Sequence, residues 1–140
     1  MNNLRITLVD DDSIFCFLFK KLIEQYPNLS IDLEIFPDGY SAAESLRNNK
    51  GIPQNQPQLL FIDINMPLMN GWELLETIYK EELLDNEQVK MYIISSSISK
   101  ADLDHSKIGI PPISYLTKPI TFSTLFREIE AYNSNFPTLN

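Results

Sequence analysis

Five short apolar runs, separated by segments with helical spacing, constrain the fold of this chain more than any other feature. The runs occupy residues 5–9, 31–36, 58–62, 90–94 and 113–117. Residues 31–36 alternate apolar and polar side chains, which is typical of a strand with one exposed face. Residues 58–62 are almost continuously apolar, which indicates a strand buried on both faces. The runs therefore predict five strands.

The segments between and after these strands predict five helices. They cover residues 13–26, 41–49, 72–84, 100–108 and 122–132, and the fourth is the most polar. Ser13 is the expected N-cap of the first helix. In the last helix one apolar face is formed by Phe122, Leu125, Phe126 and Ile129, at positions i, i+3, i+4 and i+7. Strands that alternate with helices predict a parallel sheet covered on both faces, a doubly wound α/β fold.

Length and composition fit one small domain. The 140 residues carry 19 acidic and 11 basic side chains, a formal net charge of −8, which argues against binding to nucleic acid. The N-terminus has no basic segment followed by an apolar one, and no apolar stretch approaches the ~20 residues of a membrane span. We expect a single cytoplasmic domain over residues 1–140, with residues 133–140 as a C-terminal tail. The lone Cys16 lies in an apolar run and predicts a buried thiol.

Polar side chains follow four of the five predicted strands. Asp10, Asp11 and Asp12 follow the first strand, and Asp63 follows the third with Asn65 two residues later. The fourth strand leads to Ser95 and the fifth to Lys118. In doubly wound folds ligands bind beyond the carboxyl ends of the strands, so these groups are expected to converge.

Grouped carboxylates repel one another unless a cation lies between them. Oxygen ligands suit a hard ion such as Mg²⁺, which typically takes one or two carboxylates together with phosphate oxygens and water. A carboxylate such as that of Asp63 can act as a nucleophile and form an acyl phosphate. The ammonium of Lys118 and the hydroxyl of Ser95 could then contact phosphoryl oxygens.

These motifs together resemble the receiver domain of two-component response regulators. The resemblance covers residues 5–132 and depends on four segments in this order: LVDDD at 8–12, FIDINMPLMNG at 61–71, IISS at 93–96 and YLTKP at 115–119. It implies a flavodoxin-like fold with strand order 2-1-3-4-5. Each motif alone would be weak, whereas the four at these spacings are specific.

The resemblance implies a metal site around the phosphoacceptor. Asp63 matches the phosphorylated aspartate. Asp11 matches a direct ligand of Mg²⁺ (or Mn²⁺), and Asp10 matches the neighbouring acid that acts through water or from outside the ligand shell. Asn65 matches the position whose backbone carbonyl completes the metal site.

The resemblance also implies a switch and a phosphoryl-binding pair. Ser95 and Lys118 match the residues that bind phosphoryl oxygens, and Ser95 with Tyr115 matches the switch pair. The family usually has a cis peptide at the position of Lys118–Pro119. Because Ser95 begins a run of three serines, its assignment rests on its place directly after the apolar run.

The function expected from this resemblance is that of a stand-alone response regulator in a phosphorelay. Asp63 would accept a phosphoryl group from a sensor histidine kinase or a histidine phosphotransfer protein. A downstream protein would read the change on the face formed by residues 100–132. We expect no enzymatic activity beyond self-catalysed phosphorylation and dephosphorylation, no nucleic-acid or membrane partner, and a monomer or a weak phosphorylation-dependent dimer.

The sequence also allows purely structural roles for some of these residues and two other functions for the chain. The acids at 10–12 could simply begin a helix, and Tyr115 could be an ordinary packed strand residue. A haloacid-dehalogenase-like phosphatase also places a nucleophilic aspartate after a strand, but it requires a second acid where this chain has Asn65. A third possibility is an interaction module that keeps the fold without being phosphorylated.

Overall fold

The sheet contains five parallel strands in the order β2-β1-β3-β4-β5, which confirms the predicted fold class and order. A computed structural model describes residues 3–27, 29–84, 88–96 and 113–135 of the chain. The strands are β1 (Asn3–Val9), β2 (Ser30–Phe36), β3 (Leu59–Asp63), β4 (Lys90–Ser95) and β5 (Ser114–Thr117). The helices are α1 (Ser13–Glu24), α2 (Gly39–Asn48), α3 (Gly71–Lys80) and α5 (Phe122–Asn135). The fourth expected helix, at residues 100–108, lies outside the described residues.

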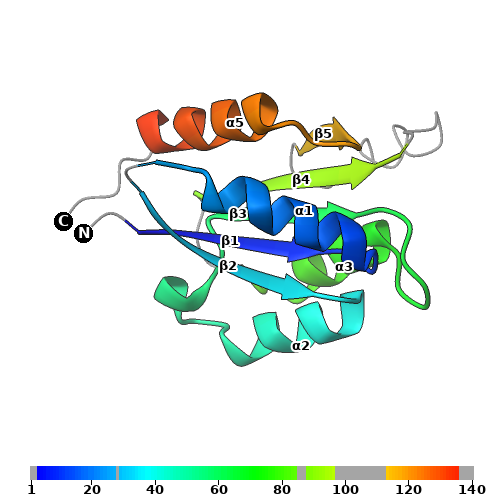
Figure 1. Cartoon of the computed structure of the whole chain (residues 1–140). Coiled ribbons are helices and arrows are strands. Elements are labelled where there is room, and N and C mark those ends of the chain that lie inside the picture. Colours follow the sequence, from blue (N-terminus) through cyan, green and yellow to red (C-terminus); the bar gives the residue numbers. More distant parts are fainter. Residues whose placement is uncertain (1–2, 28, 85–87, 97–112, 136–140) are drawn as a thin grey trace.

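The four helices cover both faces of the sheet, with α1 and α5 on one face and α2 and α3 on the other (Figure 1). Each face has its own apolar core. The first joins α1 and α5 to side chains such as Leu8 and Phe61, and the second joins α2 and α3 to side chains such as Val9 and Ile62. Neighbouring strand residues point to opposite faces, so the continuous apolar pattern of β3 serves both cores.

The core under α1 and α5 contains a continuous row of aromatic rings. The ring of Phe19 in α1 meets that of Phe61 edge-on, with centroids 5.2 Å apart. Phe61 stacks on Tyr92 of β4 with centroids 4.4 Å apart. The Tyr92 hydroxyl donates a hydrogen bond of 3.0 Å to Glu128 of α5. This row fixes α1 against the sheet through contacts of favourable aromatic geometry. As predicted, Cys16 is buried on the same helix.

At the starts of α1 and α2, neighbouring aspartates provide the N-caps, which the sequence patterns did not predict. Asp12, and not Ser13, caps α1, since its carboxylate accepts the backbone N–H groups of Ile14 and Phe15 at 3.0 and 3.1 Å. Asp38 likewise caps α2 by accepting the N–H of Ser41 at 2.7 Å, so α2 begins at Gly39. An aspartate is as good an N-cap as a serine, and in both places it stands one residue before the first helical one.

The ends of α3 and α5 differ most from the prediction. Helix α3 ends at Lys80 instead of residue 84, because Glu82 adopts a left-handed φ of 51° and the chain leaves the helix there. Leu83 is nevertheless buried, so this apolar side chain packs in the core from the segment that follows the helix. Helix α5 continues to Asn135, beyond the expected end at residue 132 and into the segment expected to be a tail.

The strand register brings the carboxyl ends of four strands to one edge of the sheet. Val9 pairs with Ile62, Asp63 with Ile94, and Ser95 with Thr117. Every residue of β3 is buried, and Asp63 is its last residue. Among the described helices, none is long and apolar enough to cross a membrane.

Candidate functional site

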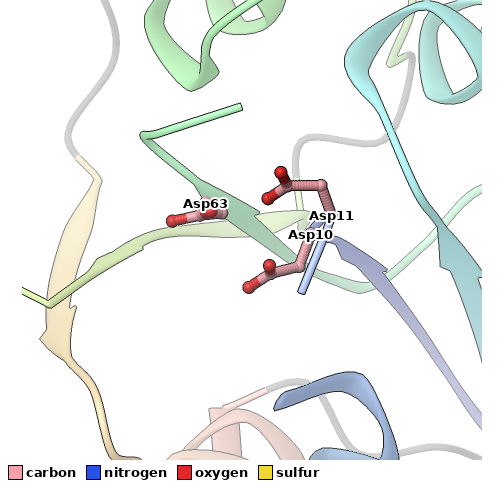
Figure 2. Close-up of side chains that lie close together, drawn as sticks. All are labelled: Asp10, Asp11 and Asp63. Atoms are coloured by element: carbon pink, nitrogen blue, oxygen red, sulfur yellow. The ribbon is translucent and has the colours of Figure 1, made fainter. Parts of the chain in front are cut away.

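Three carboxylates from two neighbouring strands meet at this edge of the sheet. Asp10 and Asp11 directly follow β1, and Asp63 ends β3 (Figure 2). One carboxylate oxygen from each lies within 4.8 Å of the other two. Asp10 and Asp63 are buried, whereas Asp11 is exposed. The site is therefore a buried acidic pair with one carboxylate facing solvent.

Lys118 extends into this group from the end of β5. Its Nζ lies 2.8 Å from Oδ2 of Asp10 and 3.8 Å from Oδ1 of Asp63. The backbone holds it there, because the N–H of Lys118 donates a 2.8 Å hydrogen bond to the carbonyl of Ser95 in β4. The Lys118–Pro119 peptide bond is cis. The short distance makes Asp10 the principal partner of the ammonium.

Their surroundings disfavour the ionised forms of the two buried acids, Asp10 and Asp63. Burial and the nearby charge of Asp10 raise the pKa of Asp63 from 3.8 to about 6, against the opposing effect of Lys118. Burial also raises the pKa of Asp10, although the Lys118 hydrogen bond and the Asp12 backbone N–H partly offset it. For Lys118, burial acts to lower the pKa, but the hydrogen bond and charge of Asp10 outweigh it and raise the pKa. A cation bound at the exposed side of the carboxylates would stabilise their ionised forms.

The three acids after β1 have separate positions. Asp10 pairs with Lys118, Asp11 is exposed beside Asp63, and Asp12 caps α1. The alternative that the acids only begin a helix thus applies to Asp12 alone. Asp10 also accepts the Asp12 backbone N–H at 2.9 Å, which fixes the turn between strand and helix.

Gly71 is required by the close approach of α3 to the end of β3. A Cβ atom added there would lie 2.5 Å from the backbone oxygen of Asp63 and 3.0 Å from the Cα of Ile64. The N–H of Gly71 donates a 2.9 Å hydrogen bond to the carbonyl of Ile64. The glycine that ends the FIDINMPLMNG segment therefore lets the first turn of α3 fix the backbone at Asp63.

Ser95 lies at the site and Tyr115 lies to one side of it. Ser95 is fully buried, and its Oγ is 3.5 Å from Nδ2 of Asn65. Tyr115 packs in the core under α2 and α3, with its ring centroid 6.2 Å from that of Trp72. Its hydroxyl oxygen is buried without a hydrogen-bond partner in the described part of the chain. The structure thus gathers Asp10, Asp11, Asp63, Ser95 and Lys118, and places Tyr115 on the neighbouring strand.

Sequence patterns did not indicate one contact of this site. The ammonium of Lys118 lies over the ring of Phe15, 4.3 Å from its centroid. Phe15 belongs to the apolar run of α1 and carries no sequence signal that separates it from an ordinary core residue.

The donor set fits a hard divalent cation. Three carboxylate oxygens within reach of one point, two of them on buried residues, form an oxygen-only group of the kind that Mg²⁺ and Mn²⁺ accept. Burial, followed by the charge of Asp10, raises the pKa of Asp63, and Lys118 offsets this only in part.

The doubly wound sheet thus carries acids at the ends of β1 and β3 and a lysine after β5, all at one edge. The sequence matches the family described as the response regulator receiver domain over residues 6–130. The chain therefore belongs to this family, whose members act in two-component signalling. This membership favours the receiver interpretation over the dehalogenase-like phosphatase.

Similar proteins span several organisms and lengths. The chain is 28% identical over 125 residues to a probable methanogenesis regulatory protein of Methanothrix harundinacea, covering 89% of this chain and 78% of that protein. A two-component response regulator from Cytophaga hutchinsonii is 25% identical, with a TM-score of 0.80 over 96% of this chain and 99% of that one. A protein-glutamate methylesterase/protein-glutamine glutaminase of Desulfotalea psychrophila is 34% identical over 76 residues, only 19% of its length. The chain thus spans a minor part of such methylesterases.

Proposed function

We propose that this chain is a phosphorylation switch that accepts a phosphoryl group on Asp63 from a histidine kinase or a histidine phosphotransfer protein. The observation that carries the proposal is the convergence of Asp10, Asp11 and Lys118 on the buried carboxylate of Asp63. These groups have the charges that the transfer requires, and the chain's family membership agrees with it.

The transfer uses Asp63 as the nucleophile. A carboxylate oxygen of Asp63 forms the new bond to phosphorus while the phosphorus–nitrogen bond of the donor phosphohistidine breaks. The electron pair of that bond remains on the imidazole nitrogen, which takes up a proton. With a pKa of about 6, Asp63 is mostly ionised at neutral pH and available for the attack.

The metal ligands in this proposal are the carboxylates of Asp11 and Asp63 and the backbone carbonyl of Asn65, with Asp10 acting through water. Bound Mg²⁺ or Mn²⁺ supplies positive charge that neutralises the transferring phosphoryl group. Lys118 contributes a second positive charge from the side of β5. The hydroxyl of Ser95 donates to a phosphoryl oxygen, so the product carries contacts that the free aspartate lacks.

The signal leaves the site through Ser95 and Tyr115. A phosphoryl group that draws Ser95 toward Asp63 changes the end of β4, and Tyr115 of β5 pairs with Ile93, two residues before Ser95 on that strand. The ring of Tyr115 is partly buried, and its hydroxyl has no hydrogen-bond partner among the described residues, which suits a side chain with two orientations. A downstream protein then binds the face that includes β5 and α5, within residues 100–132.

Incubation with acetyl phosphate and Mg²⁺, followed by intact-protein mass spectrometry, tests the proposal. We expect the mass of one phosphoryl group on the wild type and none on Asp63→Asn. Asp32→Asn, an isosteric change on the exposed side of β2, is the matched control and should be labelled like the wild type. Equal labelling of Asp63→Asn would show that another residue accepts the phosphoryl group.

A further inference from the structure

The aromatic ring of Phe15 covers one side of the lysine that faces the phosphoacceptor. The Nζ of Lys118 lies 4.3 Å from the Phe15 ring centroid, 2.8 Å from Asp10 and 3.8 Å from Asp63. From this arrangement we infer that Phe15 is a positioning residue, which holds the Lys118 ammonium beside Asp63 for the transfer. The inference rests on the proposed phosphorylation of Asp63 and concerns how fast it occurs.

The geometry lets the ring restrict the ammonium. Lysine carries its charge on a flexible four-carbon stem, and its ammonium has three donors. Asp10 accepts from the ammonium, and the Phe15 ring lies on another side of it. The face of an aromatic ring attracts a cation, most strongly where water is excluded. Because the Lys118 side chain is only 15% exposed, this condition is met. The carboxylate of Asp63 lies 3.8 Å from the same nitrogen.

The ring is itself held in place by the core. Phe15 packs against Phe19 with ring centroids 6.1 Å apart, and Phe19 in turn meets Phe61 at 5.2 Å. Phe61 lies two residues before Asp63 on the same strand and points to the same face of the sheet. The Phe15 ring is thus held against β3 through the aromatic contacts of Phe19 and Phe61. The Asp63 carboxylate belongs to the same strand.

A lysine–phenylalanine pair with both residues on α1 shows how such a contact differs at an exposed position. Lys21 lies 5.3 Å from the ring centroid of Phe17, and both side chains are exposed. Water competes for that cation, so the contact contributes little. Phe17 therefore offers a matched control, because the same substitution on the same helix removes a lysine–ring contact that does not reach Asp63.

The test replaces Phe15 by phenylalanines with one, two and three ring fluorines, which weaken the attraction for a cation while nearly preserving shape. The rate of Asp63 phosphorylation by acetyl phosphate with saturating Mg²⁺ is measured for each. We expect the logarithm of the rate to fall steadily with fluorination, to about three- to tenfold below the wild type. Phe15→Trp should keep the wild-type rate, and Phe15→Leu should be slow. Urea unfolding of each variant establishes that it is folded.

A double-substitution cycle separates this role from simple packing. In a Lys118→Gln background, which has no ammonium, Phe15→Leu should cause no further loss of rate. The affinity for beryllofluoride, measured by calorimetry, should fall in parallel with the rate across the fluorinated series. Phe17→Leu should leave both quantities unchanged.

The outcomes distinguish the two proposals. A wild type that is not labelled at all would contradict the proposed function. A labelled wild type whose rate is unaffected by trifluorination, or slowed equally by Phe17→Leu, would overturn the role of Phe15 and leave the phosphoacceptor assignment standing.

Discussion

The ammonium of Lys118 is an ångström closer to a carboxylate oxygen of Asp10, at 2.8 Å, than to one of Asp63, at 3.8 Å. The residue proposed as nucleophile is therefore the less compensated of the two buried acids. Burial is the main cause of the raised pKa of Asp63, and Lys118 offsets it only in part, which has consequences for stability that can be measured.

We expect Asp63→Asn to stabilise the folded protein at pH 7.5 in the absence of divalent metal. The folded carboxyl has a pKa of about 6 against 3.8 as the reference value, so the ionised form disfavours folding by about 1–3 kcal/mol at that pH. The penalty is fully present above pH 7 and is lost progressively as the pH falls from about 6 to about 3.8, because the folded site then binds a proton before the unfolded chain does. Urea unfolding of both proteins from pH 7.5 down to about pH 3.5 checks this.

The comparison has a specific expected form. The wild type should approach Asp63→Asn in stability as the pH falls, and the two should become similar only below the reference pKa of 3.8. Asp32→Asn, the same change at an exposed position of β2, is the control for the substitution itself. A constant difference between wild type and Asp63→Asn across this range would contradict the raised pKa.

Divalent metal should stabilise the protein through the same carboxylates. A ligand that binds only the folded state at ten times its dissociation constant adds about 1.4 kcal/mol to the free energy of unfolding. We expect Mg²⁺ or Mn²⁺ to raise the melting temperature of the wild type, and excess EDTA to remove the increase. Asp11→Asn should abolish the effect, because Asp11 is the exposed carboxylate of the three. An undiminished shift in that variant would place the metal elsewhere.

Gly71→Ala should damage both folding and phosphorylation. The new methyl group would lie 2.5 Å from the backbone oxygen of Asp63, so the start of α3 or the end of β3 must move. We expect a loss of about 1–3 kcal/mol in the free energy of unfolding, as for other overpacked sites, together with slower labelling by acetyl phosphate.

Gly39→Ala is the matched control for this change. A Cβ at Gly39 would lie 2.8 Å from the sulfur of Met69, and a flexible methionine side chain can move aside whereas a backbone carbonyl cannot. Gly39→Ala should therefore cost less stability and leave labelling near the wild-type rate. If the two alanine variants behaved alike, the close contact at Asp63 would not be limiting.

The single tryptophan should report on the state of Tyr115. Trp72 is buried, and its ring centroid lies 6.2 Å from that of Tyr115. If Tyr115 reorients when Asp63 carries a phosphoryl mimic, the surroundings of the indole change. We expect beryllofluoride with Mg²⁺ to change the emission of Trp72 in the wild type and to have a much smaller effect in Tyr115→Leu. An equal response in both would mean that the signal reaches Trp72 by another route.

The sequence was sufficient for the sheet and for most of the site, because both depend on local patterns. Short apolar runs predicted every strand, and the polar residues after them predicted that Asp10, Asp63 and Lys118 would meet. The cap of α1 was assigned to Ser13 instead of Asp12, since both are good capping residues and only the backbone geometry separates them.

The contact between Phe15 and Lys118 could not be predicted in this way. It joins α1 to the residue that follows β5 and depends on how α1 is rotated about its axis above the sheet. That rotation is decided by the packing of Phe19 on Phe61, which no local pattern encodes. The end of α3 was missed for a similar reason, because Leu83 is apolar for a tertiary contact and not for helical periodicity.

The complete burial of β3 limits how the switch can move. Amide groups in the centre of such a sheet exchange with solvent only when the whole domain unfolds. The backbone that carries Asp63 is therefore a fixed reference, and a change at its side chain cannot spread by bending the strand. The parts that can move in response to a change at Asp63 are therefore those around the strand. They are Lys118 beyond β5, Ser95 at the end of β4, and the turn from Asp63 to Gly71.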